Sequence, residues 1–429
     1  MKKKALKTTF FLLLISGAAK VLSFLIRILT ARLLNQEALN YYSLTMPVLM
    51  FLIALSNFGI PNALTKLVAS KKESRASISA SIILSLINNL FLLLVSILGI
   101  PLYAKIVMKQ EILIPVLYAC VPMLPFVMAT GLLKGYFSGR HQLLLSYSSQ
   151  MTEELFRLIF LVMFYPHFSH SPVLMAAFAV FSQTIGEIGS LLHLSLSLII
   201  QKGSSITSFP HVSVPFEAFQ ELLSLSVPMT ASRMIGSLTA FLEPVFMVQF
   251  ASELMQKSYV DIYAQMNTYI LPLITLPGFF SVVISSWVLP AFSNAYERSR
   301  QQAKTIFVFS AFLCLAIGCS CSLIYYFFST EVCHLLYHET KMASLLKLLS
   351  LPFSIYAMQP VLSCILHGAS KSTRALFDTC AGCLLRLISM ILFVKHSLTD
   401  AAAYSLIISS LVTTMLHLHG CISLFFNHD

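Results

Sequence analysis

Apolar stretches long enough to cross a lipid bilayer follow one another along nearly all of the 429 residues, and only short polar connections separate them. An α-helix needs about 20 predominantly apolar residues to span the hydrocarbon core. Stretches of this kind predict helices at residues 8–34, 40–68, 77–104, 112–137, 143–165, 172–200, 217–249, 262–292, 304–329, 344–367, 374–395 and 400–426. The pattern therefore predicts an all-α integral membrane protein of about twelve transmembrane helices, without a separate soluble domain.

Two of these helices contain residues that interrupt helical structure. Gly59 and Pro61 fall inside the second helix, and Pro272 and Pro277 fall inside the eighth. Proline removes a backbone donor, and glycine weakens a helix interior. In membrane proteins such breaks occur where the backbone lines a cavity or the helix must bend. A kink without function is the alternative interpretation.

An internal repeat divides the chain into two halves of six helices. LLKGYFSGRHQ after the fourth helix resembles ILHGASKSTRA after the tenth, and ELFRLIF around Arg157 resembles CLLRLIS around Arg386. The longest polar connection, QKGSSITSFPHVSVPFE, lies between the sixth and seventh helices. Parallel repeats of this kind are typical of transporters. We predict an N-terminal six-helix bundle at 1–201, a cytoplasmic linker at 202–216 and a C-terminal six-helix bundle at 217–429.

The composition agrees with lipid as the solvent. The chain is 57% hydrophobic and only 10% charged, whereas soluble proteins average about 25% charged residues. The N-terminal MKKKALKTTFFLLLISGAAK has the basic and apolar parts of a secretory signal, but the apolar pattern continues past Lys20 to about Leu34. We therefore expect this segment to be retained as the first helix.

The formal net charge of +11 comes from cations scattered over the connections, not from a basic face that would bind nucleic acid. Their distribution follows the positive-inside rule, by which cytoplasmic connections are rich in Lys and Arg. The cytoplasmic side is assigned Lys2, Lys3, Lys4, Lys7, Lys66, Lys71, Lys72, Arg75, Lys134, Arg140, Lys202, Arg298, Arg300, Lys304, Lys371 and Arg374. The outer side is assigned Arg32, Lys105, Lys109, Lys257, Lys341, Lys347 and Lys395. Both termini of this multi-pass cell-membrane protein are therefore predicted to be cytoplasmic.

Ionisable residues in the middle of predicted helices are candidates for substrate binding, because a charge inside the bilayer is costly. Lys20 and Arg27 in the first helix are close to two turns apart, so they point to one side together with Ser23. In the seventh helix Arg233 lies near the middle, and Ser237 follows one turn later. The arginine fork suits a phosphate group because it donates two hydrogen bonds at once. Pairing with acids of neighbouring helices is the structural alternative.

Other charged residues have a partner on their own helix. Glu153 precedes Arg157 by one turn, and Asp378 precedes Arg386 by two turns, so we predict mirrored structural pairs that contribute to the cavity only secondarily. Glu243 and Asp378 are alternatively candidates for binding a coupling cation, Na⁺ or H⁺. No other cofactor is predicted.

Signals for metal binding and catalysis are weak. His334 and His338 lie one turn apart beside Cys333, but two imidazoles in an exposed connection do not predict a metal site. The sequence has no glycine-rich phosphate loop with its lysine, and no motif for covalent catalysis stands out. The nine cysteines, Cys380 and Cys383 included, are interpreted as packing residues. The chain is therefore expected to be neither an enzyme nor an ATP-driven pump.

Several segments resemble one family of membrane proteins. The first two helices of stage V sporulation protein B-like polysaccharide flippases are similar to SGAAKVLSFLIRILTARLL, YYSLTMPV and FGIPNALTKLVAS. Further similar segments follow in the same order: KGYFSGRHQ, SQMTEELFR, SVPMTASRMIGSLTAFLEP, LPLITLPGFFSVVISSWVLPAFSNA and HGASKSTRALFDTCAGCLLR. The resemblance thus covers both halves and most of the chain. This family belongs to the multidrug/oligosaccharidyl-lipid/polysaccharide exporter superfamily, together with lipid II flippases and multidrug and toxin extrusion transporters.

The resemblance implies a V-shaped pair of six-helix bundles that works by alternating access. It also implies a cargo of undecaprenyl-diphosphate-linked oligosaccharide or lipid II, moved from the inner to the outer leaflet. Arginines on the first helices of both halves line the cavity in lipid II flippases, which assigns that role to Arg27, Arg233 and, by extension, Lys20. Asn35 and Asn40 depart from the family pattern, which has frequent glycines there. Twelve helices are predicted where many relatives have two more that hold a lipid-binding groove.

We therefore expect a flippase for lipid-linked sugars. A cation-coupled multidrug or metabolite antiporter of the multidrug and toxin extrusion type is the first alternative, and a membrane scaffold without transport is the second. Charges in the middle of predicted helices disfavour the scaffold. The lipid bilayer and the lipid-linked sugar are the expected partners, cell-envelope glycosyltransferases are candidate partners, and the chain is expected to act as a monomer.

The charge distribution makes a testable prediction about topology. Single cysteines introduced at Lys105, Lys257 and His338 should react with a membrane-impermeant maleimide in intact cells, whereas cysteines at Lys72 and Arg300 should react only after the membrane is opened. A cysteine-free parent, whose nine native cysteines are replaced, supplies the background. External labelling at residue 72 or 300 would contradict the twelve-helix topology.

Overall fold

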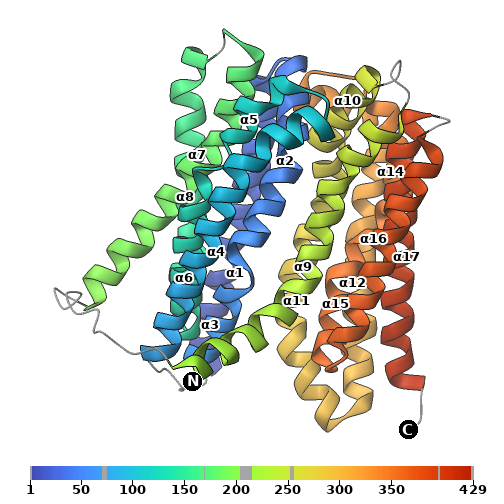
Figure 1. Ribbon diagram of the computed structural model, residues 1–429. Helices are drawn as coiled ribbons and strands as arrows, with labels where there is room; N and C mark the ends of the chain where they lie inside the picture. The colour runs from blue at the N-terminus through green and yellow to red at the C-terminus, as the bar shows by residue number, and fades with distance from the viewer. Residues whose placement is uncertain are drawn as a thin grey trace. The chain divides into compact units, whose positions relative to one another are not determined.

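The protein is helical throughout the part that its computed structural model describes, residues 2–69, 75–168, 170–202, 215–251, 256–394 and 397–426 (Figure 1). Side chains are described in these ranges except at residues 2–13, 75, 202, 228, 229, 232, 233, 256, 257, 398, 400 and 426. The predicted all-α class is confirmed. The chain divides into two compact units, Met1–Phe241 and Leu242–Asp429, which we call the N-terminal and C-terminal units.

The helices of the N-terminal unit follow the predicted stretches, with interruptions inside two of them. In chain order they are α1 (Lys2–Leu33), α2 (Gln36–Asn57), α3 (Ile60–Ala69), α4 (Arg75–Leu102), the π-helical η1 (Tyr103–Val107), the 3₁₀ turn η2 (Glu111–Leu113), α5 (Ile114–Tyr118), α6 (Met123–Gly139), α7 (Leu143–Phe168) and α8 (Pro172–Lys202). The next helix, α9 (Phe216–Phe250), crosses the boundary between the units without a break.

The C-terminal unit continues with the remaining helices. They are α10 (Gln256–Gln265), the π-helical η5 (Met266–Ile270), α11 (Leu271–Arg298), α12 (Arg300–Phe327), α13 (Ser329–Tyr337), α14 (Ala343–Phe353), the 3₁₀ turn η6 (Ser354–Met358), α15 (Gln359–Gly368), α16 (Ser372–Phe393) and α17 (Leu398–Phe426). The predicted linker at 202–216 falls mostly on residues 203–214, outside the described residues, so the predicted domain limits stay a prediction.

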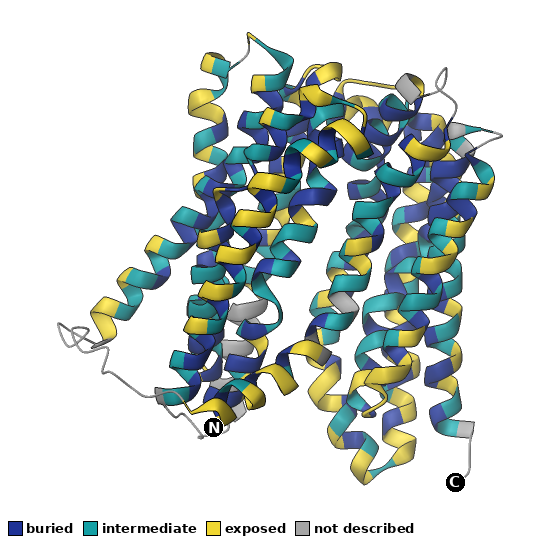
Figure 2. Cartoon of the chain, viewed as in Figure 1, coloured by how far each residue is buried: buried dark blue, intermediate teal, exposed yellow. Residues whose placement is uncertain are grey.

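Ten helical segments among the described residues are long and apolar enough to cross a membrane. Two predicted helices are not among the ten. In α7 the central stretch carries Glu153, Glu154 and Arg157, and in α9 the apolar segment Met234–Phe250 is shorter than the others. With these two helices the prediction of about twelve is consistent with the structure. Apolar side chains remain exposed along the outer helices, as on α4 (Figure 2), because lipid rather than water surrounds them.

The second predicted helix breaks where glycine and proline predicted it. Asn57 ends α2, Phe58 adopts a left-handed conformation, and Gly59 has φ +66°. A Cβ atom on Gly59 would stand 2.5 Å from the carbonyl oxygen of Ser226 on α9, so only glycine fits. The break lets α3 pack beside the start of α9, where Ala218 and Leu222 are buried against Ile60 and its neighbours. In the eighth predicted helix, Pro272 is instead the second residue of α11, which follows η5 directly, and Pro277 lies inside α11 without ending it.

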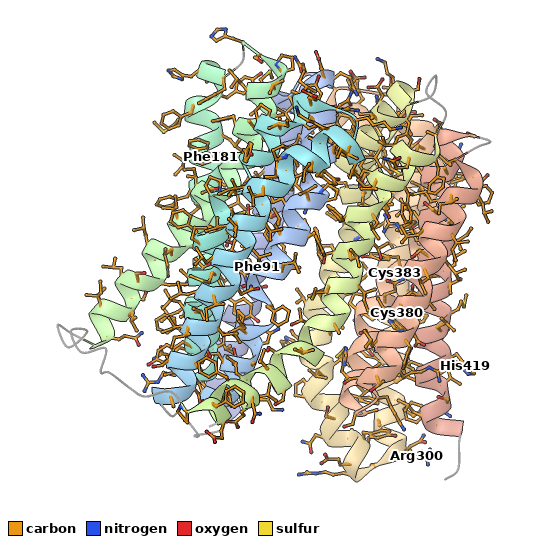
Figure 3. All side chains as sticks on the ribbon, viewed as in Figure 1. Phe91, Phe181, Arg300, Cys380, Cys383 and His419 are labelled. Carbon is orange, nitrogen blue, oxygen red and sulfur yellow. The ribbon has the colours of Figure 1, made fainter. Side chains whose placement is uncertain are left out.

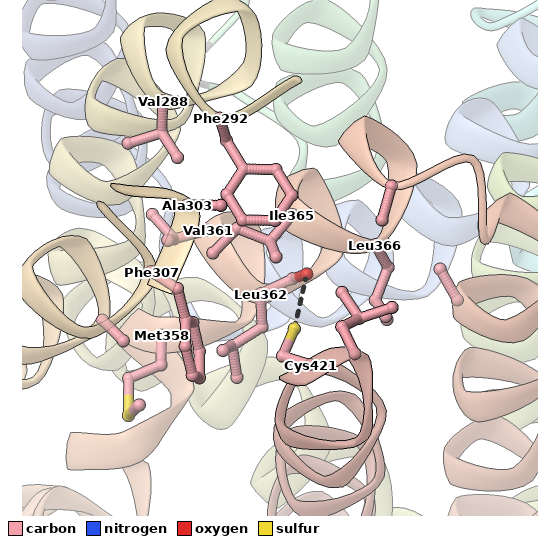
Figure 4. Close-up of a cluster of buried hydrophobic side chains, with 14 of the residues drawn as sticks. Val288, Phe292, Ala303, Phe307, Met358, Val361, Leu362, Ile365, Leu366 and Cys421 are labelled. Carbon is pink, nitrogen blue, oxygen red and sulfur yellow. Dashed lines mark hydrogen bonds between the residues drawn. The ribbon is translucent and has the colours of Figure 1, made fainter. Parts of the chain in front are cut away.

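The core of the C-terminal unit forms where α11, α12, α15 and α17 meet (Figure 4). Phe292, Val361 and Ile365 are fully buried there, and the Cys421 thiol donates to the carbonyl oxygen of Leu362 at 3.4 Å. All nine cysteines are free. Cys380 and Cys383 lie on α16 (Figure 3), one turn apart and half-buried. A thiol in these positions packs as a small apolar group.

The internal repeat is visible in how helices cross in each unit. The repeat aligns Gly135 on α6 with Gly368 on α15. Each glycine lies against an earlier helix of its own unit, α3 for Gly135 and α11 for Gly368. A Cβ on Gly135 would meet the carbonyl oxygen of Pro61 on α3 at 2.5 Å, and a Cβ on Gly368 would meet Phe292 and Ser293 on α11 at 3.0 Å. Small residues allow two membrane helices to approach closely. The α7–α8 pair in one unit likewise corresponds to α16–α17 in the other.

The crossing of α3 and α6 makes Gly135→Ala destabilising. An alanine there overlaps backbone that cannot move away, and overpacking typically costs about 1–3 kcal/mol. Gly99→Ala on α4 is the matched control, because a Cβ at Gly99 meets nothing within 4 Å and alanine favours a helix. Thermal unfolding of the purified variants in detergent should show a lower Tm for Gly135→Ala and an unchanged or higher Tm for Gly99→Ala. Equal Tm values would contradict the close crossing.

Candidate functional site

A polar cavity of about 220 Å³ lies among α1, α6, α7 and α8 of the N-terminal unit. Its walls carry both signs of charge together with amide and hydroxyl groups. The lining residues are Ala19, Lys20, Ser23, Lys134, Gln150, Glu153, Glu154 and Glu187. Five of these eight residues are ionisable, and ionisable side chains gathered inside a membrane bundle make the cavity a candidate functional site.

The carboxylate of Glu153 on α7 is paired with Lys134 on α6. The Lys134 ammonium donates to Glu153 Oε2 at 3.1 Å, and the two side chains are only 22% and 25% exposed. The ion pair therefore connects two different helices, α6 and α7. Lys134 lies within α6, as the predicted stretch 112–137 placed it, and it lines the cavity; its assignment to the cytoplasmic side stays a prediction.

The guanidinium of Arg157 is held on three sides. Its Nη1 lies 3.8 Å from Glu154 Oε2, and its Nε donates to the Ser182 hydroxyl at 3.3 Å. With the Gln183 amide turned so that its oxygen faces the guanidinium, that oxygen accepts from Nη2 at 2.9 Å and from Nη1 at 3.1 Å. The side chain is 6% exposed. The predicted pair of Glu153 and Arg157 is wrong. Glu153 is paired with Lys134, and Arg157 is paired with Glu154, which precedes it by three residues on the same side of the helix.

Glu187 on α8 supplies the third carboxylate of the cavity. It is 8% exposed, and its Oε2 accepts a hydrogen bond from the Thr130 hydroxyl at 2.6 Å. The formal charges of this cluster balance, since Lys20, Lys134 and Arg157 stand beside Glu153, Glu154 and Glu187. A balanced cluster lowers the desolvation cost that any of these groups would incur alone.

The predicted cations of the first helix lie on the exposed side of α1. Lys20 and Ser23 line the cavity, and the Ser23 hydroxyl is hydrogen-bonded to the Glu154 carboxylate. Arg27 is exposed and does not line this cavity. The side chain of Arg233 lies outside the described residues, although its backbone belongs to α9. Ser237 donates to the carbonyl oxygen of Met234 on its own helix at 3.1 Å.

Two further charge clusters lie in the C-terminal unit. Arg386 on α16 forms an ion pair with Glu243 on α9, whose side chain is 4% exposed. Asp378 accepts from Arg374 Nε at 3.2 Å and is hydrogen-bonded to His417 Nδ1 on α17 at 3.0 Å. The predicted pair of Asp378 and Arg386 is therefore wrong, since each residue has a nearer partner. The two candidate ion-coupling acids each have a basic partner in this structure.

Several residues of these clusters were missed in the sequence. Thr130, Gln150 and Gln183 gave no signal, because hydroxyl and amide groups are common in membrane helices. Lys134 did give one, since it falls inside the apolar stretch 112–137. His417 stands in the middle of the last apolar stretch, which is a comparable signal. No group of three or more His, Cys, Asp and Glu residues suited to a metal ion is found among the described residues.

A helical membrane protein with charge clusters inside its bundles belongs to the class of polytopic transporters. Residues 5–296 match the family of polysaccharide biosynthesis proteins. This match covers more than half of the chain, so the chain belongs to that family.

Characterised relatives extend the similarity over nearly the full length. The chain is 26% identical to stage V sporulation protein B of Bacillus subtilis (strain 168), over 97% of this chain and 83% of the relative. It is 22% identical to the lipid II flippase MurJ of the same organism, over 94% of this chain and 79% of the relative. The predicted resemblance to this flippase family is confirmed.

Solved structures show the same fold. A lipid II flippase MurJ in an inward closed conformation aligns with a TM-score of 0.73 at 16% identity, covering 97% of this chain and 89% of that chain. An inward-facing multidrug resistance transporter of the MATE family aligns with a TM-score of 0.71 at 15% identity, covering 95% and 94%. At these identities the likeness concerns the fold, and it agrees with a multi-pass membrane protein.

The pairing inside the N-terminal unit predicts a specific pattern of rescue. Arg157→Met should lower the amount of folded protein, because breaking a buried ion pair costs about 3–5 kcal/mol. Adding Glu154→Gln should restore folding, since the neighbouring carboxylate loses its charge. Adding Glu153→Gln instead balances the net charge but leaves Lys134 without its partner, so folding should not recover. The monodisperse peak in fluorescence-detected size-exclusion chromatography measures each level. Equal rescue by both double variants would contradict the assigned pairs.

Proposed function

We propose that this protein is a flippase that moves an undecaprenyl-diphosphate-linked oligosaccharide, or lipid II, from the inner to the outer leaflet of the cell membrane by alternating access. Family membership and the relatives named above support the class of cargo. In this proposal the protein is a transporter and not an enzyme. It works as a monomer with both termini in the cytoplasm, and it receives its cargo from cell-envelope glycosyltransferases.

The observation that carries the proposal is the position of Lys20 in the cavity. Lys134 donates to Glu153, and Arg157 forms an ion pair with Glu154 and donates to Ser182 and to the turned amide of Gln183. Lys20 is exposed and lines the cavity without an ion pair to any described side chain. It is therefore the cation of this cluster that is accessible to an incoming anion, and a diphosphate offers several charged oxygens to such a group.

Arg27, Arg233 and the hydroxyls complete the proposed substrate site. Arg27 lies two turns beyond Lys20 on the same helix and is exposed. In the proposal Arg27 and Arg233 bind the diphosphate through paired N–H groups, while Ser23 and Ser237 donate to sugar or phosphate oxygens. Uncharged sugars need hydrogen bonds rather than charge, and Gln150 beside Lys20 offers both a donor and an acceptor.

Coupling to Na⁺ or H⁺ at Glu243 or Asp378 is the proposed source of energy. A cation that binds Glu243 must displace Arg386, and one that binds Asp378 competes with Arg374 and His417. Binding would therefore release a basic side chain from its acid. That exchange would link ion binding to the packing of α16 against α9 or α17.

The three carboxylates of the cavity favour a second candidate, a cation-coupled antiporter for cationic drugs or metabolites. Ionised carboxylates attract organic cations, and proteins of the MATE family share the fold. Reconstituted vesicles separate the candidates. A flippase moves a fluorescent lipid-linked sugar to the far leaflet without a drug gradient. An antiporter expels a cationic dye when a Na⁺ or H⁺ gradient is imposed and leaves the lipid-linked sugar where it was.

Lys20→Ala and Arg27→Ala should each slow flipping of a fluorescent undecaprenyl-diphosphate-linked sugar by about tenfold or more, because a hydrogen bond to a charged group contributes about 1.5–3 kcal/mol. Protection of the fluorophore from dithionite measures the rate. Arg27→Lys should recover part of it, since the charge remains and the fork does not. Lys66→Ala, which removes an exposed cation from α3, is the control and should flip normally. Normal rates in both alanine variants would refute the cationic site.

A further inference from the structure

The cavity of the N-terminal unit is lined by three carboxylates, although the cargo proposed for it carries a diphosphate. Glu153 is neutralised by Lys134 at 3.1 Å, and Glu154 faces Arg157 at 3.8 Å. Glu187 forms no ion pair with any side chain that the structure describes, yet it lines the cavity wall. One carboxylate therefore stands without a cation of its own, at a place that a ligand can reach.

The surroundings of Glu187 are negative. Its main electrostatic neighbours are the carboxylates of Glu153 and Glu154 and the single ammonium of Lys134, which already donates to Glu153. Glu187 is only 8% exposed, so water screens the repulsion between these carboxylates poorly. A positive group entering from the cavity would relieve that repulsion.

Thr130 fixes the direction of the Glu187 carboxylate. The Thr130 hydroxyl donates to Glu187 Oε2 at 2.6 Å, which holds this oxygen against α6. An ionised carboxylate can accept about four hydrogen bonds, and no other group that the structure describes donates to this one. Glu187 therefore keeps acceptor capacity for a ligand, and an ammonium group, which only donates, matches it.

Lys20 supplies the opposite charge at another part of the cavity wall. Lys20 lies on α1 and Glu187 on α8, and α7 is in contact with both helices. Lys20 interacts electrostatically with Glu154, but it is not among the main electrostatic neighbours of Glu187. The two accessible charges therefore do not neutralise each other, and the cavity has a positive side and a negative side.

The size of the cavity limits what it can hold. Its volume of about 220 Å³ lies below the range of about 300–1,000 Å³ found for pockets that take drug-sized ligands. The cavity therefore takes only a small part of the cargo, the region around the diphosphate and the first sugar, and not a whole oligosaccharide.

We propose that this cavity recognises a headgroup with charges of both signs, with a phosphate of the lipid diphosphate at Lys20 and an ammonium group at Glu187. The inference rests on the proposed flippase function and narrows its cargo to lipid-linked sugars that carry a free amine. The amine belongs to an amino sugar or to an aminoacyl substituent on the sugar. A neutral sugar leaves Glu187 without a counter-charge, and a uronic acid adds a carboxylate to a wall that is already negative.

Three lipids that differ at one position test this inference on the full-length wild type, purified in detergent. They are undecaprenyl diphosphate linked to N-acetylglucosamine, to N-glycylglucosamine or to glucosamine. The glycyl group differs from the acetyl group only by an added ammonium on an aminoacyl arm, whereas glucosamine carries its ammonium on the ring. Microscale thermophoresis measures each Kd. An amine-bearing lipid should bind about tenfold tighter than the acetylated lipid, the factor expected for one charge-assisted contact, and the tighter of the two identifies the source of the amine.

Three variants assign the effect to its residues. Glu187→Gln, whose amide oxygen can still accept from Thr130, should lose the preference for an amine and keep its Kd for the acetylated lipid. Lys20→Ala should weaken binding of all three lipids by a similar factor, because each carries the diphosphate. Glu331→Gln removes an exposed carboxylate from α13 in the C-terminal unit and is the matched control, which should keep the preference. A monodisperse peak in size-exclusion chromatography shows that each variant is folded, and the comparison of lipids on the wild type decides without any variant.

The outcomes separate this inference from the proposed function. Equal Kd values of the wild type for the three lipids would overturn the inference, and so would a preference for the amine that survives in Glu187→Gln. In either case a wild type that flips the acetylated lipid across reconstituted vesicles still supports the flippase. A wild type that prefers the amine and flips none of the lipids would refute the proposed function and leave the binding site standing. A wild type that binds none of the lipids would overturn both.

Discussion

Charge neutralisation inside an apolar environment organises the N-terminal unit. An isolated ion there costs several kcal/mol in desolvation, so each of the buried charges must find a partner before the helices can pack. Lys134 meets Glu153 across two helices, and Arg157 meets Glu154, Ser182 and Gln183. These contacts fix how α6, α7 and α8 face one another, and the cavity is the space that the polar groups leave between them.

The apolar environment also explains which features the sequence could predict. The thickness of a bilayer sets the length of an apolar stretch, so the ten long apolar segments among the described residues and their approximate limits follow from hydropathy. Gly59 was recognisable because a left-handed residue in close contact with another helix admits no side chain. The repeated Gly135 and Gly368 were recognisable because both halves need a close crossing at the same place. Local backbone requirements of this kind leave a direct mark in the sequence.

Partners across helices leave no such mark. Helical spacing suggested that Glu153 would pair with Arg157 and Asp378 with Arg386, yet Lys134, Glu243 and His417 come from other helices. One residue can satisfy a charge from any neighbouring helix, and a single sequence does not show which helices are neighbours. The sequence equally gives no indication of which polar groups complete each cluster, and Gln183 is an example. The candidate site was therefore predicted in its type of residue and only partly in its geometry.

The contact of Gly135 with Pro61 has a mechanical consequence for the N-terminal unit. Two helices whose backbones are in contact cannot slide along each other without steric overlap, so α3 and α6 are expected to move as one rigid pair. The regular helical pattern is interrupted nearby at Phe58 and Gly59, which have positive φ, and at the turn between α5 and α6, where Cys120 and Val121 bond to carbonyl groups three residues earlier instead of four. Any bending of these two segments is therefore expected at the α2–α3 and α5–α6 junctions, while α3 and α6 keep their relative positions.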